Sequence, residues 1–172
     1  MINEVELNDI NASSISVIMV SYMTGPALFE AIKHVILDTK ISELIIIDNG
    51  NPEQVREKLF LLVKSYGHIK VKTGHGNIGF SKGCNYGAKV ASGNYLLFLN
   101  PDALITKNSA TKLMNLGKTL KRPWITGGKL INSRGEEQRG SRRGEVTLFA
   151  PAALLSVHLA YVKVLSLEVT TP

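Results

Sequence analysis

The chain has 172 residues, of which 44% are hydrophobic, so it is long enough for one compact domain with a sizeable core and short for two. Its single cysteine, Cys84, excludes an internal disulfide bond. The N-terminal residues MINEVELNDI are acidic, whereas a secretory signal is basic and then apolar. Together these features predict a cytoplasmic protein.

The net charge of +6 is unevenly distributed. Ten of the twenty Lys and Arg residues lie between Lys107 and Arg143, where the only acids are Glu136 and Glu137. Such a segment favours phosphate groups or a membrane surface, although a solvated basic face explains it equally well. It contains few aromatic residues for base stacking and no known nucleic-acid-binding motif, so we expect no nucleic acid partner.

Short apolar runs alternate with segments of helical periodicity along the chain. The predicted strands are Ile15–Ser21, Glu43–Asp48, Ile69–Thr73, Tyr95–Leu99 and Trp124–Ile131. Helices are predicted from Pro26 to Ile36, after an N-cap at Asn51, over Ser81–Ala91 and around the leucines 113, 116 and 120. This alternation predicts an α/β fold with a mainly parallel sheet and helices on both faces.

Residues 148–167 are almost all apolar. About fifteen of them precede Lys163, fewer than the roughly 20 that a membrane-spanning helix needs. We therefore predict a domain over residues 1–145 and a separate segment over 146–172, which forms a helix that packs on the domain or on a second subunit in a homodimer. A helix on a membrane surface, beside Arg142 and Arg143, is the alternative.

In a parallel sheet, ligands bind at the carboxyl ends of the strands. The residues at these positions are Ser21-Tyr22, Asp48-Asn49, the loop 74–79 and the segment Asn100-Pro101-Asp102. Two carboxylates, Asp48 and Asp102, thus follow the two most hydrophobic strands. We expect both to face one cleft, although an acid at a strand end is also a common turn or helix cap.

The loop includes a G-x-G-x-x-G pattern formed by Gly74, Gly76 and Gly79, and Asp102 lies 23 residues further on. This pattern is typical of dinucleotide binding. The strand before it is short and polar, however, and two strand-helix units already precede it. About one strand follows Leu99, too few for the rest of a dinucleotide fold.

The same region also reads N-x-G-F-x-x-x-x-N-x-G, followed by an apolar strand that ends in N-P-D. Here the sequence resembles the family 2 glycosyltransferases of the GT-A fold, and most closely their rhamnosyltransferase-like members. The segments that carry the resemblance are SVIMVSY, ELIIIDNGN, GNIGFSKGCNYG, ASGNYLLFLNPDALI and GGKLINSRG. They cover residues 15–143, and the chain resembles a family member truncated at its C-terminus.

The resemblance implies a site for a nucleoside-diphosphate sugar. The implied donor-binding residues are Ser21, Tyr22, Asp48, Asn77, Gly79, Phe80, Asn85, Gly87 and Asn100. Asp48 would accept a hydrogen bond from the imide N–H of uracil or thymine. Asp102 would bind the Mg²⁺ or Mn²⁺ ion that holds the diphosphate. Many relatives have an aspartate where this chain has Asn100, so the metal site carries one negative charge fewer.

Sugar transfer also requires a general base, and no catalytic residue of this kind is identified. After Arg143 the only acids are Glu145 and Glu168, neither of them in a recognisable motif. The leading hypothesis is a glycosyltransferase that moves a sugar, with rhamnose as the candidate, from a UDP- or dTDP-sugar donor to a saccharide or lipid-linked acceptor, in polysaccharide or lipopolysaccharide assembly. Family resemblance implies inversion at the anomeric carbon. The predicted glycosyltransferase would act in the cytoplasm or at the inner face of the membrane.

Two other hypotheses stay open from the sequence. One is a non-catalytic module that binds nucleotide sugars or another protein and lacks the general base. The other is a dinucleotide-binding oxidoreductase, which predicts NAD binding without a metal requirement.

Overall fold

The computed structural model describes residues 13–132, 134–137 and 168–170. Its main sheet has four parallel strands in the order β3-β2-β1-β4. These strands are β1 (Ile15–Ser21), β2 (Ile41–Asp48), β3 (Ile69–Lys72) and β4 (Tyr95–Phe98). The predicted α/β fold with a mainly parallel sheet is confirmed, and the four predicted strands agree with the observed ones to within two residues.

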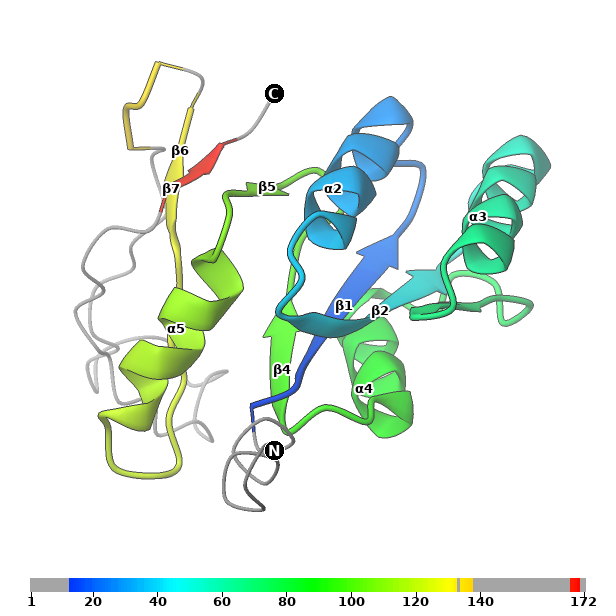
Figure 1. Ribbon diagram of the computed structural model, residues 1–172. Coiled ribbons are helices and arrows are strands. Elements are labelled where there is room, and N and C mark those ends of the chain that lie inside the picture. The colour runs from blue at the N-terminus through cyan, green and yellow to red at the C-terminus, as the bar shows by residue number, and fades with distance from the viewer. Residues whose placement is uncertain (1–12, 133, 138–167, 171–172) are drawn as a thin grey trace, which may run out of the picture.

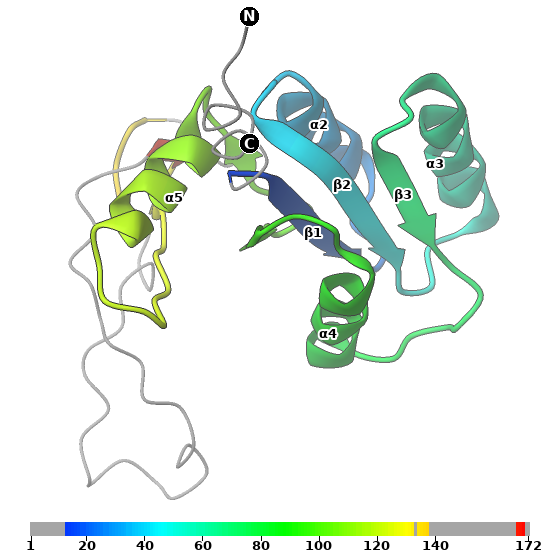
Figure 2. The ribbon, with the colours of Figure 1, turned by 60° about the horizontal axis from the view of Figure 1, so that its bottom comes forward.

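Three helices cover the two faces of this sheet (Figures 1 and 2). They are α2 (Pro26–Ile36), α3 (Glu53–Ser65) and α4 (Phe80–Val90). Proline occupies the first turn of α2, as predicted, where its missing N–H costs nothing. α2 and α3 lie on one side of the sheet, and α4 lies on the other.

Side chains of β1 and β2 alternate between the two layers of core. Val17 and Met19 of β1 pack with Leu28 and Ile32 of α2, while Ile18 packs on the opposite face against α4. All eight residues of β2 except Ser42 are buried. A strand covered on both faces reads as a continuous apolar run, which is why β1 and β2 were recognisable from the sequence.

Two glycines let α4 approach the sheet closely. A Cβ atom on Gly83 would lie 2.8 Å from Val20 Cγ1, and one on Gly87 would lie 2.4 Å from Ile18 Cγ2. Both distances are shorter than side chains tolerate, so any larger residue would push the helix away from β1. The glycines that weaken the helical signal in the sequence are therefore required by the packing.

A second, smaller sheet lies beside the first, next to helix α5 (Ser109–Lys118) (Figure 1). Its strands are β5 (Leu104–Ile105), β6 (Lys129–Ile131) and β7 (Glu168–Thr170), in the order β5-β7-β6. β7 is parallel to β6 and antiparallel to β5.

The predicted strand Trp124–Ile131 is wrong in two respects: its first five residues do not form a strand, and the remaining residues do not belong to the main sheet. Only Lys129–Ile131 forms a strand, and it pairs with β7 and not with the main sheet. Trp124 instead stacks on Tyr95 of β4, with ring centroids 5.6 Å apart. Its ring also fills the space over Gly117 of α5, where a Cβ atom would lie 2.2 Å from Trp124 Cζ3. The packing of this large ring against Tyr95 and Gly117 overrides the β-propensity of the segment.

The apolar segment 148–167, predicted to be a helix, lies outside the described residues. So does Glu145. Within residues 13–132 and 134–137, no helix is long and apolar enough to cross a membrane.

Candidate functional site

The parallel register brings the ends of β1 and β2 together. Ser21 pairs with Asp48, and the N–H of Asn49 donates to the Ser21 carbonyl at 2.8 Å. Both strands therefore finish at the same end of the sheet, as parallel strands in register must. The loops that follow them form the centre of the candidate site.

Asp48 holds the loop after β2 with its side chain. Its Oδ1 accepts from the N–H of Asn51 at 2.9 Å, from Asn51 Nδ2 at 2.8 Å and from the N–H of Gly50 at 3.3 Å. Its Oδ2 accepts from the Thr73 hydroxyl, at the end of β3, at 2.7 Å. Asp48 is only 2% exposed. Burial by itself raises the pKa of Asp48, but these hydrogen bonds, that from Thr73 foremost, lower it below its usual value.

The predicted N-cap at Asn51 is wrong. α3 begins at Glu53, Pro52 occupies the cap position, and no side chain caps the helix. Asn51 is buried and joins the loops after β1 and β2 instead: its Nδ2 donates to the Ser21 carbonyl at 3.1 Å, and its Oδ1 accepts from the Met23 N–H at 3.0 Å. An asparagine before a proline favours a helix cap in isolation, but here the neighbouring strand offers stronger partners.

A second asparagine attaches the glycine-rich loop to β2. Asn49 Nδ2 donates to Asn77 Oδ1 at 2.8 Å, and Asn49 Oδ1 accepts from the Ile78 N–H at 3.0 Å. Asn77 Oδ1 also accepts from the N–H of Gly79, the residue before α4, at 2.9 Å. Gly79 has φ +84°, which a larger side chain rarely adopts. The loop is thus held in one conformation at the start of α4.

Two polar residues of this cluster, Asn51 and Thr73, were missed as site residues, and Asn49 was named only for its position after β2, without a role. Asn49 and Thr73 follow directly on β2 and β3, so their position at strand ends was a usable signal. Asp48 is a local partner of Asn51, but its other partners, Ser21 and Met23, are 30 and 28 residues away and could not be read from local pattern.

The exposed rim of the site carries two more of the predicted residues, Tyr22 and Phe80. Tyr22 is 53% exposed and Phe80 is 58% exposed. The Tyr22 ring lies over Gly50, where a Cβ atom would be 3.7 Å from Tyr22 Cε2 and 3.8 Å from the Asn77 N atom. Tyr22, Gly50 and Asn77 are therefore neighbours, although they come from three different loops.

Some predicted residues lie apart from this cluster. Gly87 is buried and its Cα faces Ile18, so the structure gives it a packing role, and a donor contact for it stays a prediction. Asn85 is exposed on α4. Asn100 and Asp102 are exposed in the turn after β4, which the Ala103 N–H closes onto the Asn100 carbonyl at 3.1 Å.

Asp102 suits a hard divalent cation as a ligand. It is exposed, and no side chain or backbone donor in the described ranges is hydrogen-bonded to its carboxylate. No cluster of three or more His, Cys, Asp or Glu residues occurs in the described part of the chain. Magnesium and manganese commonly bind through one or two carboxylates, with water and substrate phosphate as the other ligands. A lone accessible carboxylate therefore fits a metal that arrives with its substrate.

The sequence of residues 16–141 matches the family described as Glycosyl transferase family 2. The chain belongs to this family. Membership decides against the dinucleotide-binding interpretation of the glycine-rich loop.

Two curated relatives of this glycosyl transferase family 2 chain support the assignment. It is 31% identical over 103 residues to the minor teichoic acid biosynthesis protein GgaB of Bacillus subtilis (strain 168), covering 58% of this chain and 11% of that one. It is 26% identical over 95 residues to the glycosyltransferase GlyG of Streptococcus pneumoniae serotype 4, covering 55% and 32%. The chain thus spans a third or less of the length of these relatives.

Solved structures share the fold and identify it as GT-A. S. aureus TarS 1-349 matches with a TM-score of 0.57 at 19% identity, over 78% of this chain and 38% of that one. GalNAc-T7, crystallised with UDP, GalNAc and Mn²⁺, matches with a TM-score of 0.54 at 26% identity, over 58% and 20%. The mannosyltransferase PcManGT of Pyrobaculum calidifontis, in complex with GDP-Man and Mn²⁺, matches with a TM-score of 0.55 at 13% identity, over 67% and 34%.

Proposed function

We propose that this chain binds a nucleoside-diphosphate sugar, within a glycosyltransferase that moves the sugar to a saccharide or lipid-linked acceptor. The observation that carries the proposal is the hydrogen-bonded arrangement of three loops at the carboxyl ends of the parallel strands. Asp48, Asn49 and Asn77 shape this edge, and Tyr22 and Phe80 remain exposed on its rim. Family membership supplies the class of chemistry.

The nucleobase, in this proposal, lies beside Ser21, Tyr22 and Asp48. The Tyr22 ring is 53% exposed and offers a flat apolar surface for a base. Asp48 Oδ2 accepts only one of the described hydrogen bonds, from Thr73, so a lone pair remains for an imide N–H. This geometry supports uracil or thymine as the base.

The diphosphate lies, in the same proposal, between the start of α4 and the turn after β4. The amino end of a helix favours negative charge. A divalent metal, when bound at Asp102, would supply the positive charge that stabilises the departing diphosphate. Asn100 would donate from its side-chain amide to a phosphate or ribose oxygen. With one carboxylate in place of two, we expect modest affinity for the free metal ion and tighter binding together with the nucleotide.

The finer assignments remain proposals from resemblance: rhamnose as the sugar, inversion at the anomeric carbon, and polysaccharide or lipopolysaccharide assembly as the setting. The relative GgaB is named for teichoic acid biosynthesis, which is also polymer assembly. We further propose residues 1–145 as the donor-binding domain, acting in the cytoplasm or at the inner face of a membrane. The general base is not identified.

A thermal-shift panel tests the proposal, because a ligand that binds only the folded state raises the melting temperature. The ligands are UDP, dTDP, GDP and NAD, each with and without Mn²⁺. We expect a shift with UDP or dTDP that increases with Mn²⁺. Failure of every nucleoside diphosphate to shift the melting temperature would refute donor binding.

Asp102→Ala tests the metal assignment in the same panel. We expect it to weaken Mn²⁺-dependent nucleotide binding at least tenfold and to leave the ligand-free melting temperature unchanged, because the side chain is exposed. Glu57→Ala, at an exposed acid of α3, is the control for lost charge and should bind nucleotide normally. Equal affinity of Asp102→Ala and Glu57→Ala would remove the metal from Asp102.

A further inference from the structure

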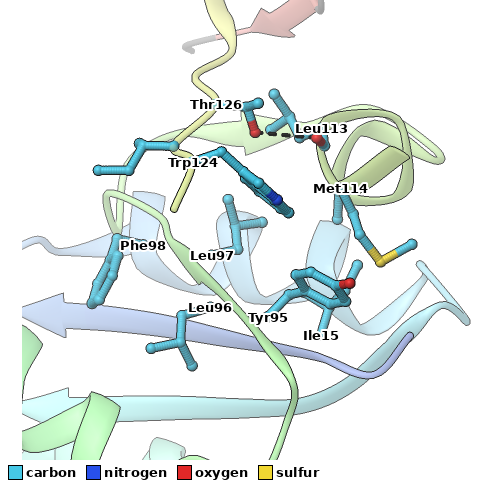
Figure 3. Close-up of a pocket in the computed structure, with 11 residues that line it drawn as sticks. Ile15, Tyr95, Leu96, Leu97, Phe98, Leu113, Met114, Trp124 and Thr126 are labelled. Carbon is cyan, nitrogen blue, oxygen red and sulfur yellow. Dashed lines mark hydrogen bonds between the residues drawn. The ribbon is translucent and has the colours of Figure 1, made fainter. Parts of the chain in front are cut away.

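A cavity lies away from the donor loops, beside β4, the outer strand of the main sheet. Its volume is about 350 Å³. Mostly apolar side chains line it from β1, from β4, from α5 and from the segment that leads into β6, and Tyr95, Trp124 and Thr126 add polar side-chain atoms. Figure 3 shows Leu97 pointing from β4 toward Trp124, whereas Leu96 and Phe98 point away from the ring. We call this cavity the β4 groove.

Exposed apolar side chains continue the surface of the β4 groove. Phe98 is 49% exposed and Ile125 is 63% exposed, and Leu96 is exposed as well. Leu96 and Phe98 share the sheet face on which α4 covers Ile18 and Val20, but α4 does not cover them. A patch of this kind on a soluble domain marks a surface that another element covers.

The backbone of β4 also has an unpaired edge among the described residues, where β4 pairs with β1 alone. The N–H groups of Tyr95 and Leu99 donate to Ser14 and Ile18 on the β1 side. Because neighbouring residues of a strand point in opposite directions, the N–H groups of Leu96 and Phe98 point to the other edge. An occupant of the β4 groove must therefore offer backbone partners as well as apolar side chains.

We propose that the β4 groove is the docking site of this chain's own residues 148–162. These fifteen residues contain no Asp, Glu, Lys or Arg and are rich in leucine, alanine and valine. They match the apolar lining of the groove, and as polypeptide they can pair with the free edge of β4. A lipid surface offers no donors or acceptors for that edge at the depth of its hydrocarbon, so it is the weaker occupant.

The residues on either side of segment 138–167 are paired with β6, near the groove. Residues 138–167 connect Glu137, which forms a bridge with Ile131 of β6, to Glu168, which pairs with Lys129 of β6. Lys129 follows the groove residue Thr126 by three positions, or about 10 Å of extended chain. A segment tethered at both ends has an effective concentration in the millimolar range, which favours it over a second copy arriving from solution.

Trp124 is the only tryptophan of the chain and lines the groove, so its fluorescence reports occupation directly. In the dilute, unmodified chain we expect blue-shifted emission that acrylamide quenches weakly and that does not change on dilution. The double substitution Leu154→Asp with Leu155→Asp should shift the emission to the red and raise the quenching constant several-fold. Leu61→Asp, at an exposed leucine of α3, is the matched control and should change neither.

Three results would overturn the proposal. The first is unchanged emission and quenching in the Leu154→Asp, Leu155→Asp protein. The second is a red shift of the unmodified chain on dilution, which would make a second copy the occupant. The third is protection of Trp124 that arises only on addition of vesicles containing anionic lipid, which would make a membrane the occupant.

A cross-link keeps the proposal testable if the double substitution prevents folding. In a Cys84→Ser background, Ile125→Cys and Ser156→Cys place one thiol at the groove and one in the segment. Mild oxidation with copper phenanthroline should join them within one chain, giving a faster-migrating monomer on a non-reducing gel. Cross-linked dimers alone, or no cross-link at all, would contradict docking within the chain.

Discussion

The two ends of the central strands both hold a buried carboxylate, but in different settings. At the amino end of β2, Glu43 accepts hydrogen bonds from the Ser16 hydroxyl at 2.6 Å and from the Ser92 hydroxyl at 2.8 Å, and it forms a salt bridge with Lys70 at 2.5 Å. At the carboxyl end, Asp48 receives hydrogen bonds only from loop backbone and neutral side chains. Both carboxyl groups have lowered pKa values.

This difference shows that a perturbed carboxylate alone does not locate a site. The cluster around Glu43 closes one end of the sheet by joining β1, β2, β3 and the loop before β4. The cluster around Asp48 also joins strands, yet it stands next to exposed Tyr22 and Asn77. We infer that the first cluster stabilises the fold and that the second one shapes a ligand site, and substitutions at the two positions can test that division.

Glu43→Ala should have the largest effect on stability. It removes the acceptor of the buried Ser16 hydroxyl and of the Ser92 N–H, and it breaks the ion pair with Lys70, whose side chain is 43% exposed, so we expect a cost of about 2–3 kcal/mol of unfolding free energy. Urea denaturation of the substituted and unmodified chains measures this loss. Glu57→Ala, an exposed acid of α3, should change stability by less than about 0.5 kcal/mol. Nucleotide affinity of the folded Glu43→Ala protein should be normal, and a selective loss of affinity would break the division.

Acid should destabilise the protein through the same group. Burial by itself raises the pKa of Glu43, but the hydrogen bonds from Lys70, Ser16 and Ser92 lower it from 4.5 to about 2. Because the folded value is lower than the unfolded one, its contribution is fully present above pH 4.5 and is lost as the pH falls toward 2. The loss amounts to about 2–3 kcal/mol. Denaturation series from pH 6 to 2 should show a smaller decline for Glu43→Gln, and parallel declines would contradict this.

Asp48→Asn should cost less stability, about 1–2 kcal/mol, because the amide oxygen can still accept from the Asn51 N–H while the charge is lost. Here we expect nucleotide affinity to fall as well, since the substitution changes the group that we propose as the hydrogen-bond acceptor for the base. Glu43→Gln is the matched control, a carboxylate-to-amide change at the other end of β2. A normal affinity in Asp48→Asn would assign Asp48 to the fold alone.

Secondary structure could be predicted from the sequence where burial alone determines the pattern of residues. β1 and β2 are buried on both faces, so their apolar runs gave the strands almost to the residue. Trp124 and Asn51 were misassigned because their partners, Tyr95 and Ser21, are distant in sequence and outweigh the local preference. In the site, the positions after each strand were predictable from the parallel topology. The hydrogen bonds from Thr73 to Asp48 and from Asn49 to Asn77 were not, because they depend on which side chains meet in three dimensions.

The glycines at positions 83 and 87 have a consequence for any attempt to alter ligand preference. They set the height of α4 above β1, and the loop 74–79 is attached to the first residue of that helix. Adding one methyl group at either position would lift the helix and carry the loop with it. Residues on the rim can thus be substituted one at a time to change ligand preference. The distance between α4 and β1, by contrast, has to be kept, because the position of the loop depends on it.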